Sequence, residues 1–286
     1  VQLAPQDFAA HYNLGITLKN LGRLDEAEAS YTQAIALKPD YAEAHNNLGN
    51  TLKELGRLDE AEASYTQAIA LKPDLAEAHS NLGNTLKELG RLEEAEASYT
   101  QAIALKPDYA EAHCNLGNTL QELGRLDEAE ESLTQAIALK PDYAEACYNL
   151  GITLQELGRL DKAEASYTQA IALKPDYAKA YSNLGVTLQE LGRLDEAEAS
   201  YTQAIALKPD FALAHYNLGK TLYKVGYKDL ALESIEKAND IDPQLKEVTL
   251  LLNVMKSRKS REESEAATGD TSNTGAKTGL TSSPLI

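Results

Sequence analysis

The histidines of this 286-residue chain are the first residues whose type and spacing could do chemistry. His11, His45, His79 and His113 are 34 residues apart, and His215 keeps the same register. If each lies on its own helix, neighbouring imidazoles are at least one helix-packing distance apart, about 8 to 10 Å. Zinc needs every ligand within about 2.1 Å. We therefore expect no metal site and interpret these histidines as rings wedged between helices.

The other signals of chemistry are equally weak. Gly219-Lys220-Thr221 matches the end of a phosphate-binding loop, but Ala214 stands where that loop needs its first glycine. Cys114 and Cys147 form no CxxC motif and indicate no disulfide framework, which fits a reducing compartment. No nucleophile elbow or HExxH motif occurs. We expect no catalytic residue, no cofactor and no enzymatic activity in this chain itself.

Charge restricts the partners. The chain has 44 acidic and 27 basic residues, and its formal net charge is −17. This charge repels phosphate backbones and anionic membrane surfaces, so it favours neutral or basic proteins and peptides over nucleic acid. No apolar run long enough to span a membrane and no signal-peptide pattern occurs, which predicts a cytoplasmic protein that does not enter the membrane.

These residues must be positioned by an internal repeat. No window is typical of a strand, and prolines recur every 34 residues from Pro39 to Pro243. The register predicts seven repeats, 8–41, 42–75, 76–109, 110–143, 144–177, 178–211 and 212–245. Residues 1–7 match the end of a preceding repeat, so we expect a fragment. Residues 246–262 are expected to form a C-terminal capping helix, and 263–286, rich in Ser, Thr and Gly, a disordered tail or linker.

A single repeat, residues 42–75, contains two amphipathic segments. Leucines and alanines recur at three and four residues on either side of Gly56, which is suited to end the first helix. Asp74 is expected to cap the next helix. Gly49 and Ala61 are small where the two helices should cross. Because a lone helical pair cannot bury its apolar face, the repeats must stack into an all-α solenoid.

The Leu48-Gly49 pair, Gly56, Ala61, Tyr65 and Pro73 resemble the pattern of the tetratricopeptide repeat (TPR) family. The resemblance extends to bacterial TPR arrays and to the repeat domain of O-GlcNAc transferases. It implies a right-handed superhelix whose concave groove is lined by the first helix of each repeat. The function it implies is binding of an extended peptide or partner protein in that groove.

The groove positions can be read from the repeats. The sixth position is always asparagine: Asn13, Asn47, Asn81, Asn115, Asn149, Asn183 and Asn217. The ninth and thirteenth positions add Asn50, Asn84, Asn118, Glu54, Glu88, Glu122, Glu156 and Glu190, while Lys53 and Lys87 at the twelfth position give way to glutamines in later repeats. The groove therefore becomes more acidic toward repeat six.

The asparagine row has two interpretations. It resembles the asparagine ladder of O-GlcNAc transferases, in which amides bond the peptide groups of an extended ligand. Alternatively, the amides satisfy groups between neighbouring repeats, or are simply carried along by duplication. Two further alternatives concern the whole chain. It could be the substrate-recruiting arm of a larger enzyme with a glycosyltransferase, oxygenase, sulfotransferase or methyltransferase domain beyond residue 286. It could also be a structural spacer, or a homo-oligomer formed through solenoid packing.

Overall fold

The computed structural model describes residues 7–269, and every regular element in that range is an α-helix. The helices are α1 (Phe8–Asn20), α2 (Leu24–Leu37), α3 (Ala42–Glu54), α4 (Leu58–Leu71), α5 (Ala76–Glu88), α6 (Leu92–Leu105), α7 (Ala110–Glu122), α8 (Leu126–Leu139), α9 (Ala144–Glu156), α10 (Leu160–Leu173), α11 (Ala178–Glu190), α12 (Leu194–Leu207), α13 (Ala212–Val225), α14 (Lys228–Ile241) and α15 (Lys246–Gly269). The predicted all-α helical-repeat solenoid is confirmed.

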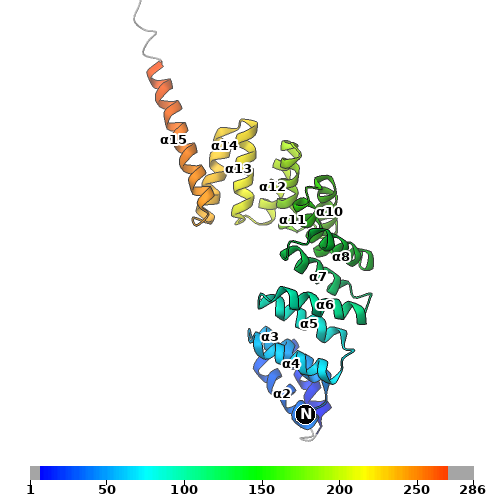
Figure 1. The fold of residues 1–286 in the computed structure, drawn as a ribbon. Coiled ribbons are helices and arrows are strands. Elements are labelled where there is room, and N and C mark those ends of the chain that lie inside the picture. The colour runs from blue at the N-terminus through cyan, green and yellow to red at the C-terminus, as the bar shows by residue number, and fades with distance from the viewer. Residues whose placement is uncertain (1–6, 270–286) are drawn as a thin grey trace, which may run out of the picture. The chain divides into compact units, whose positions relative to one another are not determined.

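The chain divides into two units, residues 1–175 and 176–286. The first contains α1 to α10 and the second α11 to α15. Within each unit the two helices of a pair pack against each other, and the second helix packs against the first helix of the next pair (Figure 1). Each unit is therefore a stack in which a helix pair contacts only its neighbours in sequence.

The turn within each pair depends on a glycine. Gly56 has a φ of 75°, a left-handed conformation that costs glycine little. The Gly56 N–H then donates to the Lys53 carbonyl, and the Arg57 N–H donates to the Leu52 carbonyl at 2.9 Å. These bonds satisfy the last carbonyls of α3 and reverse the chain into α4.

A second glycine sets the distance between paired helices. A Cβ on Gly49 would lie 2.7 Å from Cε1 of Tyr65, whose side chain is fully buried. The tyrosine ring therefore occupies the space that a side chain on α3 would need. In repeats four and seven the same space is filled by Leu133 and Ile235 instead.

The expected cap at Asp74 is wrong. Helix α5 begins at Ala76, and the residue before it is Leu75, which makes no side-chain capping bond. The helix starts one residue later than a cap at Asp74 requires, because the Leu75 N–H donates to the Lys72 carbonyl and the Ala76 N–H to the Asp74 carbonyl. Asp7 does cap α1, accepting from the Ala9 N–H at 2.9 Å.

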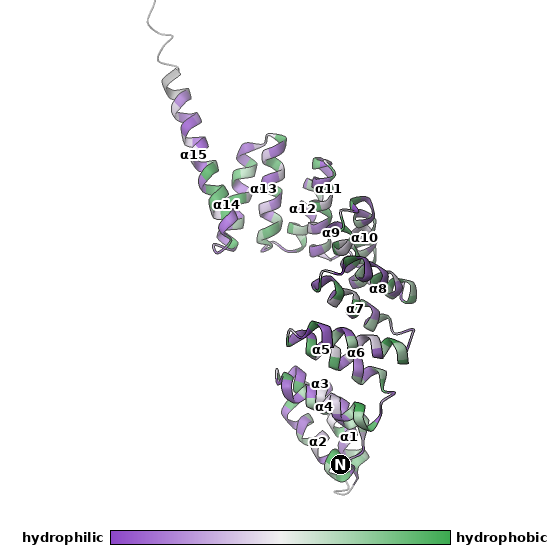
Figure 2. Ribbon diagram, viewed as in Figure 1, coloured by the Kyte–Doolittle hydropathy of each residue, from purple (hydrophilic) through white to green (hydrophobic). Residues whose placement is uncertain are grey.

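Helix α15 follows the last pair. Its residues Val248, Leu252 and Met255 are buried against α14. The predicted helix of 246–262 continues to Gly269, so the tail prediction is wrong for 263–269, where glutamates and alanines accompany Ser264 and Thr268 and no proline or glycine interrupts the helix before Gly269. Figure 2 shows α15 becoming hydrophilic beyond its contact with α14. The remaining predicted tail, 270–286, and residues 1–6 lie outside the described part of the chain.

Candidate functional site

The sixth, ninth, twelfth and thirteenth residues of the first helices form a surface that we call the first-helix face. In unit 1, consecutive first helices contact each other directly, from α1 to α3 and onward to α9. Side chains of neighbouring repeats are thereby brought within hydrogen-bonding reach.

Each half-buried asparagine of this row in repeats two to five donates one amide bond to the preceding repeat. Asn47 Nδ2 donates to the Tyr12 hydroxyl at 2.9 Å, and Asn81 Nδ2 to Asn46 Oδ1 at 3.1 Å. Asn115 Nδ2 donates to Asn84 Oδ1 at 3.0 Å. Asn149 Nδ2 contacts Cys114 Sγ at 3.8 Å. The row therefore links adjacent repeats. Whether these bonds form depends on how one repeat is stacked on the next.

These bonds leave part of each amide uncommitted. An asparagine side chain has two N–H donors and an acceptor oxygen, and the inter-repeat bond uses one donor. That bond also fixes the orientation of the amide. The structure is thus compatible with both interpretations of the row, since one amide can join repeats and still meet a ligand.

The hydrogen bonding of the asparagine at the ninth position differs between repeats. The Tyr65 hydroxyl donates to Asn50 Oδ1, and the Tyr99 hydroxyl to Asn84 Oδ1, both at 2.7 Å. In repeat four the tyrosine is replaced by Leu133, which has no hydroxyl. Asn118 Oδ1 is consequently buried without a hydrogen-bond partner among the described residues.

The charged positions also pair between repeats. Lys19 contacts Glu54 at 3.0 Å, Lys53 contacts Glu88 at 2.9 Å and Lys87 contacts Glu122 at 3.0 Å. Where lysine gives way to glutamine, Gln121 Nε2 donates to Glu156 Oε1 at 2.8 Å. Each earlier glutamate is therefore neutralised by a lysine, whereas Glu156 is held by a neutral amide.

These features meet at one cavity of about 390 Å³ in unit 1. Its lining contains four of the predicted site residues together with one lysine and one glutamine: Asn118, Glu122, Asn149, Glu156, Lys87 and Gln121. The lining combines one unsatisfied acceptor, oriented amides and a net negative charge. A ligand with N–H donors or a positive charge fits this surface best.

The Cys114 sulfur contacts Asn149, which lines the cavity, at 3.8 Å. Cys114 is 1% exposed, and burial raises the pKa of its thiol to about 11. A thiol with this pKa stays protonated at neutral pH and is a poor nucleophile. Cys147 is also a buried free thiol. Cys114 packs with Tyr143 and is covered by Ala146 of the next repeat.

The other predicted site residues lie outside this cavity. Asn13 is exposed on α1. Bonds or ion pairs between neighbouring repeats involve Asn47, Asn81, Asn84, Asn115, Glu54 and Glu88. Asn50 instead accepts from Tyr65 of its own repeat. Asn183, Glu190 and Asn217 belong to unit 2. The sequence placed Asn118 in the groove but did not distinguish it from Asn50 and Asn84, although Leu133, where most repeats have tyrosine, was the available signal.

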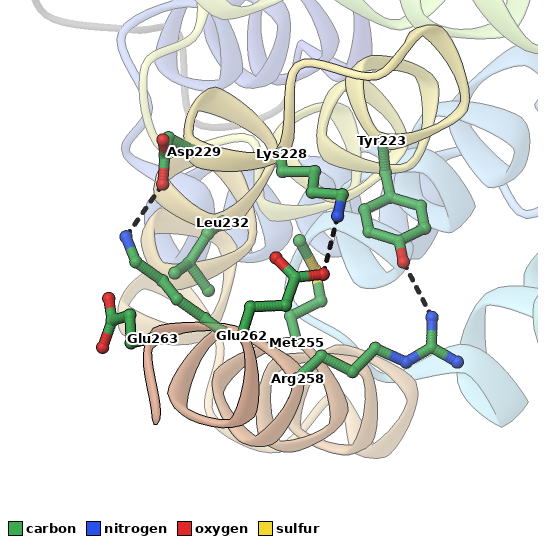
Figure 3. Close-up of a pocket in the computed structure, with 9 residues that line it drawn as sticks. Tyr223, Lys228, Asp229, Leu232, Met255, Arg258, Glu262 and Glu263 are labelled. Atoms are coloured by element: carbon green, nitrogen blue, oxygen red, sulfur yellow. Dashed lines mark hydrogen bonds and ion pairs between the residues drawn. The ribbon is translucent and has the colours of Figure 1, made fainter. Parts of the chain in front are cut away.

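A second cavity, of about 240 Å³, lies between α15 and the last helix pair (Figure 3). Its charged walls are largely paired: Lys228 with Glu262 at 2.7 Å and Lys259 with Asp229 at 2.8 Å. Arg258 donates to the Tyr223 hydroxyl at 2.7 Å. This arrangement fastens α15 to repeat seven and offers a ligand few uncommitted groups.

Four of the five histidines contact a backbone carbonyl that is close in sequence. Nε2 of His45, His79, His113 and His215 lies 3.0 to 3.1 Å from the carbonyl oxygen of the proline six residues earlier. Among the described residues, no group of three or more His, Cys, Asp or Glu side chains could hold a metal ion. In the same range, none of the helices has the length and apolar character needed to cross a bilayer.

Comparison with known proteins supports the repeat assignment. Models described as "TPR repeat" match residues 17–56, 49–90, 83–124 and 188–226, and models described as "Tetratricopeptide repeat" match 1–29, 108–176, 166–199 and 212–245. No curated protein sequence matches the chain.

Solved structures of similar fold include three repeat proteins. YrrB, described as "a TPR protein with an unusual peptide-binding site", is 27% identical, with a TM-score of 0.56 over 64% of this chain and 95% of its own. MamA is 29% identical, with a TM-score of 0.54 over 58% of this chain and 96% of its own. A tetratricopeptide repeat protein from Parabacteroides merdae, 21% identical, shares the fold with a TM-score of 0.65 over 87% of this chain and 98% of its own.

The family matches cover each of the helix pairs, and the glycines, tyrosines and prolines that set their geometry occupy the positions described above. Proteins built from such repeats are protein-interaction scaffolds. The chain belongs to the tetratricopeptide repeat family.

Proposed function

We propose that this chain is a protein-interaction module that binds an extended peptide on its first-helix face, at the Asn118 cavity of unit 1. The observation that carries the proposal is the buried, unpartnered Asn118 Oδ1. An unsatisfied buried acceptor costs about 1 to 3 kcal/mol, and because Asn118 lines the cavity, a turn of its amide would let a ligand donate to this oxygen.

The neighbouring groups support a peptide as the ligand. Asn149 keeps one amide donor and its oxygen beyond the bond to Cys114. Peptide N–H and C=O groups match such amides without requiring a particular side chain. The resemblance of the asparagine row to O-GlcNAc transferase arrays agrees with this role, as does the peptide-binding site described for YrrB.

The charge of the cavity favours a neutral or basic partner. Glu122 is paired with Lys87, but Glu156 is bonded only to neutral Gln121 among its described hydrogen bonds and ion pairs. The net charge of −17 disfavours nucleic acid and anionic membranes. Two buried, unpaired thiols suit the reducing cytoplasm, where we propose the protein acts without catalysis of its own.

The test compares Asn118→Ala with Asn84→Ala as a matched control. Asn118→Ala removes an acceptor that has no partner, so we expect the melting temperature to stay level or rise while partners captured from a lysate are lost. Asn84→Ala removes the acceptor of two bonds and leaves the Tyr99 hydroxyl unsatisfied, so stability should fall by about 1 to 3 kcal/mol. Identical captured proteins for wild type and a folded Asn118→Ala variant would refute the proposal.

A further inference from the structure

Repeat seven departs from the earlier repeats on the outer face of its second helix. In repeats one to four and six, an arginine before the second helix makes a two-pronged ion pair with a glutamate three residues on, as Arg57 does with Glu60. In repeat seven these positions are Tyr227 and Leu230. Their side chains are 54% and 53% exposed, so a charged pair has been replaced by an exposed apolar pair.

Leu230 lies at the rim of a cavity of about 690 Å³, which we call the repeat-seven cavity. It is formed by α12, α13 and α14, all in unit 2, and its apolar lining is Leu230 with Ile205, Leu218 and Leu222. Its volume is within the range of ligand-binding pockets. None of its residues belongs to the first-helix face at the Asn118 cavity.

The rest of the lining is mostly acidic. Glu233, Glu236 and Asp240 are on α14, at positions where α12 has Ala199, Thr202 and Ala206. Glu236 is paired with Lys256 at 2.9 Å. The cationic group of the lining is Lys237, and His215 lines the cavity with its Nε2 3.0 Å from the Pro209 carbonyl oxygen. Carboxylates therefore outnumber cations in the cavity.

The fourth carboxylate, Glu198, has lost its partner. In earlier repeats the equivalent glutamate accepts from the arginine of the next repeat: Glu28 from Arg57, Glu62 from Arg91 and Glu96 from Arg125, each at 2.7 Å. The residue that would serve Glu198 is Tyr227. Among the described residues, no ion pair to the Glu198 carboxylate occurs. The cavity thus has a vacant place for a guanidinium or ammonium group.

We propose that the repeat-seven cavity is a second docking surface, which binds a basic amphipathic helix of a partner protein. Apolar residues of that helix pack on Leu230 and into the cavity, and a Lys or Arg occupies the place of the missing arginine beside Glu198. Leu230 and Asp240 are about 15 Å apart along α14 at the helical rise of 1.5 Å per residue, which matches about three turns of a partner helix.

The test uses two synthetic amphipathic peptides of equal length, one of Leu and Lys and one of Leu and Glu. Binding to the full chain is followed by fluorescence anisotropy. The key variant, Tyr227→Arg with Leu230→Glu, restores the pair used in earlier repeats and leaves the net charge unchanged. Non-specific attraction between an acidic protein and a basic peptide is therefore the same in both proteins.

We expect saturable binding of the Leu/Lys peptide, at least tenfold weaker binding to the double variant, and no saturable binding of the Leu/Glu peptide. Glu198→Gln should weaken binding several-fold. If the double variant fails to fold, Leu230→Ser serves in its place, since it changes only one exposed side chain. Equal binding by wild type and a folded variant would overturn the proposal, as would equal binding of the two peptides.

Discussion

At the scale of single residues, the two glycines of each repeat do different work. Gly56 is required for its backbone conformation, because its φ is 75° and the space around its Cα is open. Gly49 is required for space, because Tyr65 fills the position of its missing side chain. The two glycines of the family pattern therefore satisfy two separate physical constraints, one on backbone conformation and one on space between the helices.

A substitution at each glycine should separate these constraints. Gly49→Ala forces the buried Tyr65 ring to move and should destabilise the protein by roughly 1 to 3 kcal/mol, the usual cost of overpacking. Gly56→Ala introduces strain at positive φ without any clash and should cost about 1 kcal/mol. Urea denaturation followed by circular dichroism gives both values. A larger loss for Gly56→Ala than for Gly49→Ala would show that close packing is not the stronger constraint.

The hydrogen-bond partners of the asparagine row could not be predicted from the sequence. Its regular spacing is visible in the sequence, but its partners are at the fifth or ninth position of the preceding repeat, as in Asn81 with Asn46 and Asn115 with Asn84. Which position is reached depends on how one repeat stacks on the next. No local sequence pattern encodes how one repeat stacks on the next, so the sequence left both interpretations of the asparagine row open.

At the scale of elements, helix existence was predictable and helix ends were less so. The 34-residue period and the spacing of apolar residues correctly indicate two helices per repeat. Asp74 failed as a cap because backbone bonds through Lys72 place the helix start one residue later than the composition indicates. Helix α15 ends later than expected because the composition of 263–268 permits both helix and coil.

Helix α15 is stabilised mainly by its apolar contact. Leu252 is 7% exposed in the core of repeat seven, whereas Lys259 and Asp229 pair on the open surface. Exposed ion pairs contribute little, and burial of a leucine contributes much more. We therefore expect Leu252→Ala to accelerate amide hydrogen exchange throughout α15 and in the adjoining part of α14, and Lys259→Ala to leave it unchanged. Faster exchange in Lys259→Ala than in Leu252→Ala would mean that the ion pairs hold the helix.

At the scale of the whole molecule, stability comes from repeated nearest-neighbour contacts around buried tyrosines. Five of the seven helix pairs place a tyrosine against the glycine of the first helix: Tyr31, Tyr65, Tyr99, Tyr167 and Tyr201. The remaining two use Leu133 and Ile235. Because the repeats resemble each other, the effects of substitutions at equivalent positions on the free energy of unfolding should add from repeat to repeat.

The tyrosines give the molecule a defined response to alkali. Burial raises the pKa of Tyr31 from 10.0 to about 12, and it raises the pKa of Tyr65, Tyr99 and Tyr201 as well. A raised folded-state pKa stabilises the protein below the unfolded-state pKa, and this stabilisation is lost as the pH rises through the folded-state pKa. The melting temperature should therefore not fall through tyrosine ionisation below about pH 9, and it should fall steeply above about pH 10.

Tyrosinate absorbance measured alongside circular dichroism checks this response. Ionisation of the buried tyrosines should coincide with loss of helix. Full ionisation of all fifteen tyrosines near pH 10 in a protein that remains helical would contradict the burial described here.

The central claim is that the unsatisfied Asn118 binds peptide partners, and Leu133→Tyr tests it most directly. This change introduces the tyrosine that most other repeats have, where the glycines equivalent to Gly117 accommodate it. The new hydroxyl would donate to Asn118 as the Tyr65 hydroxyl donates to Asn50. Calorimetric titration would use a partner first captured by the wild-type chain. The account predicts unchanged or higher thermal stability and at least tenfold weaker binding. Unchanged affinity in the folded variant would contradict it.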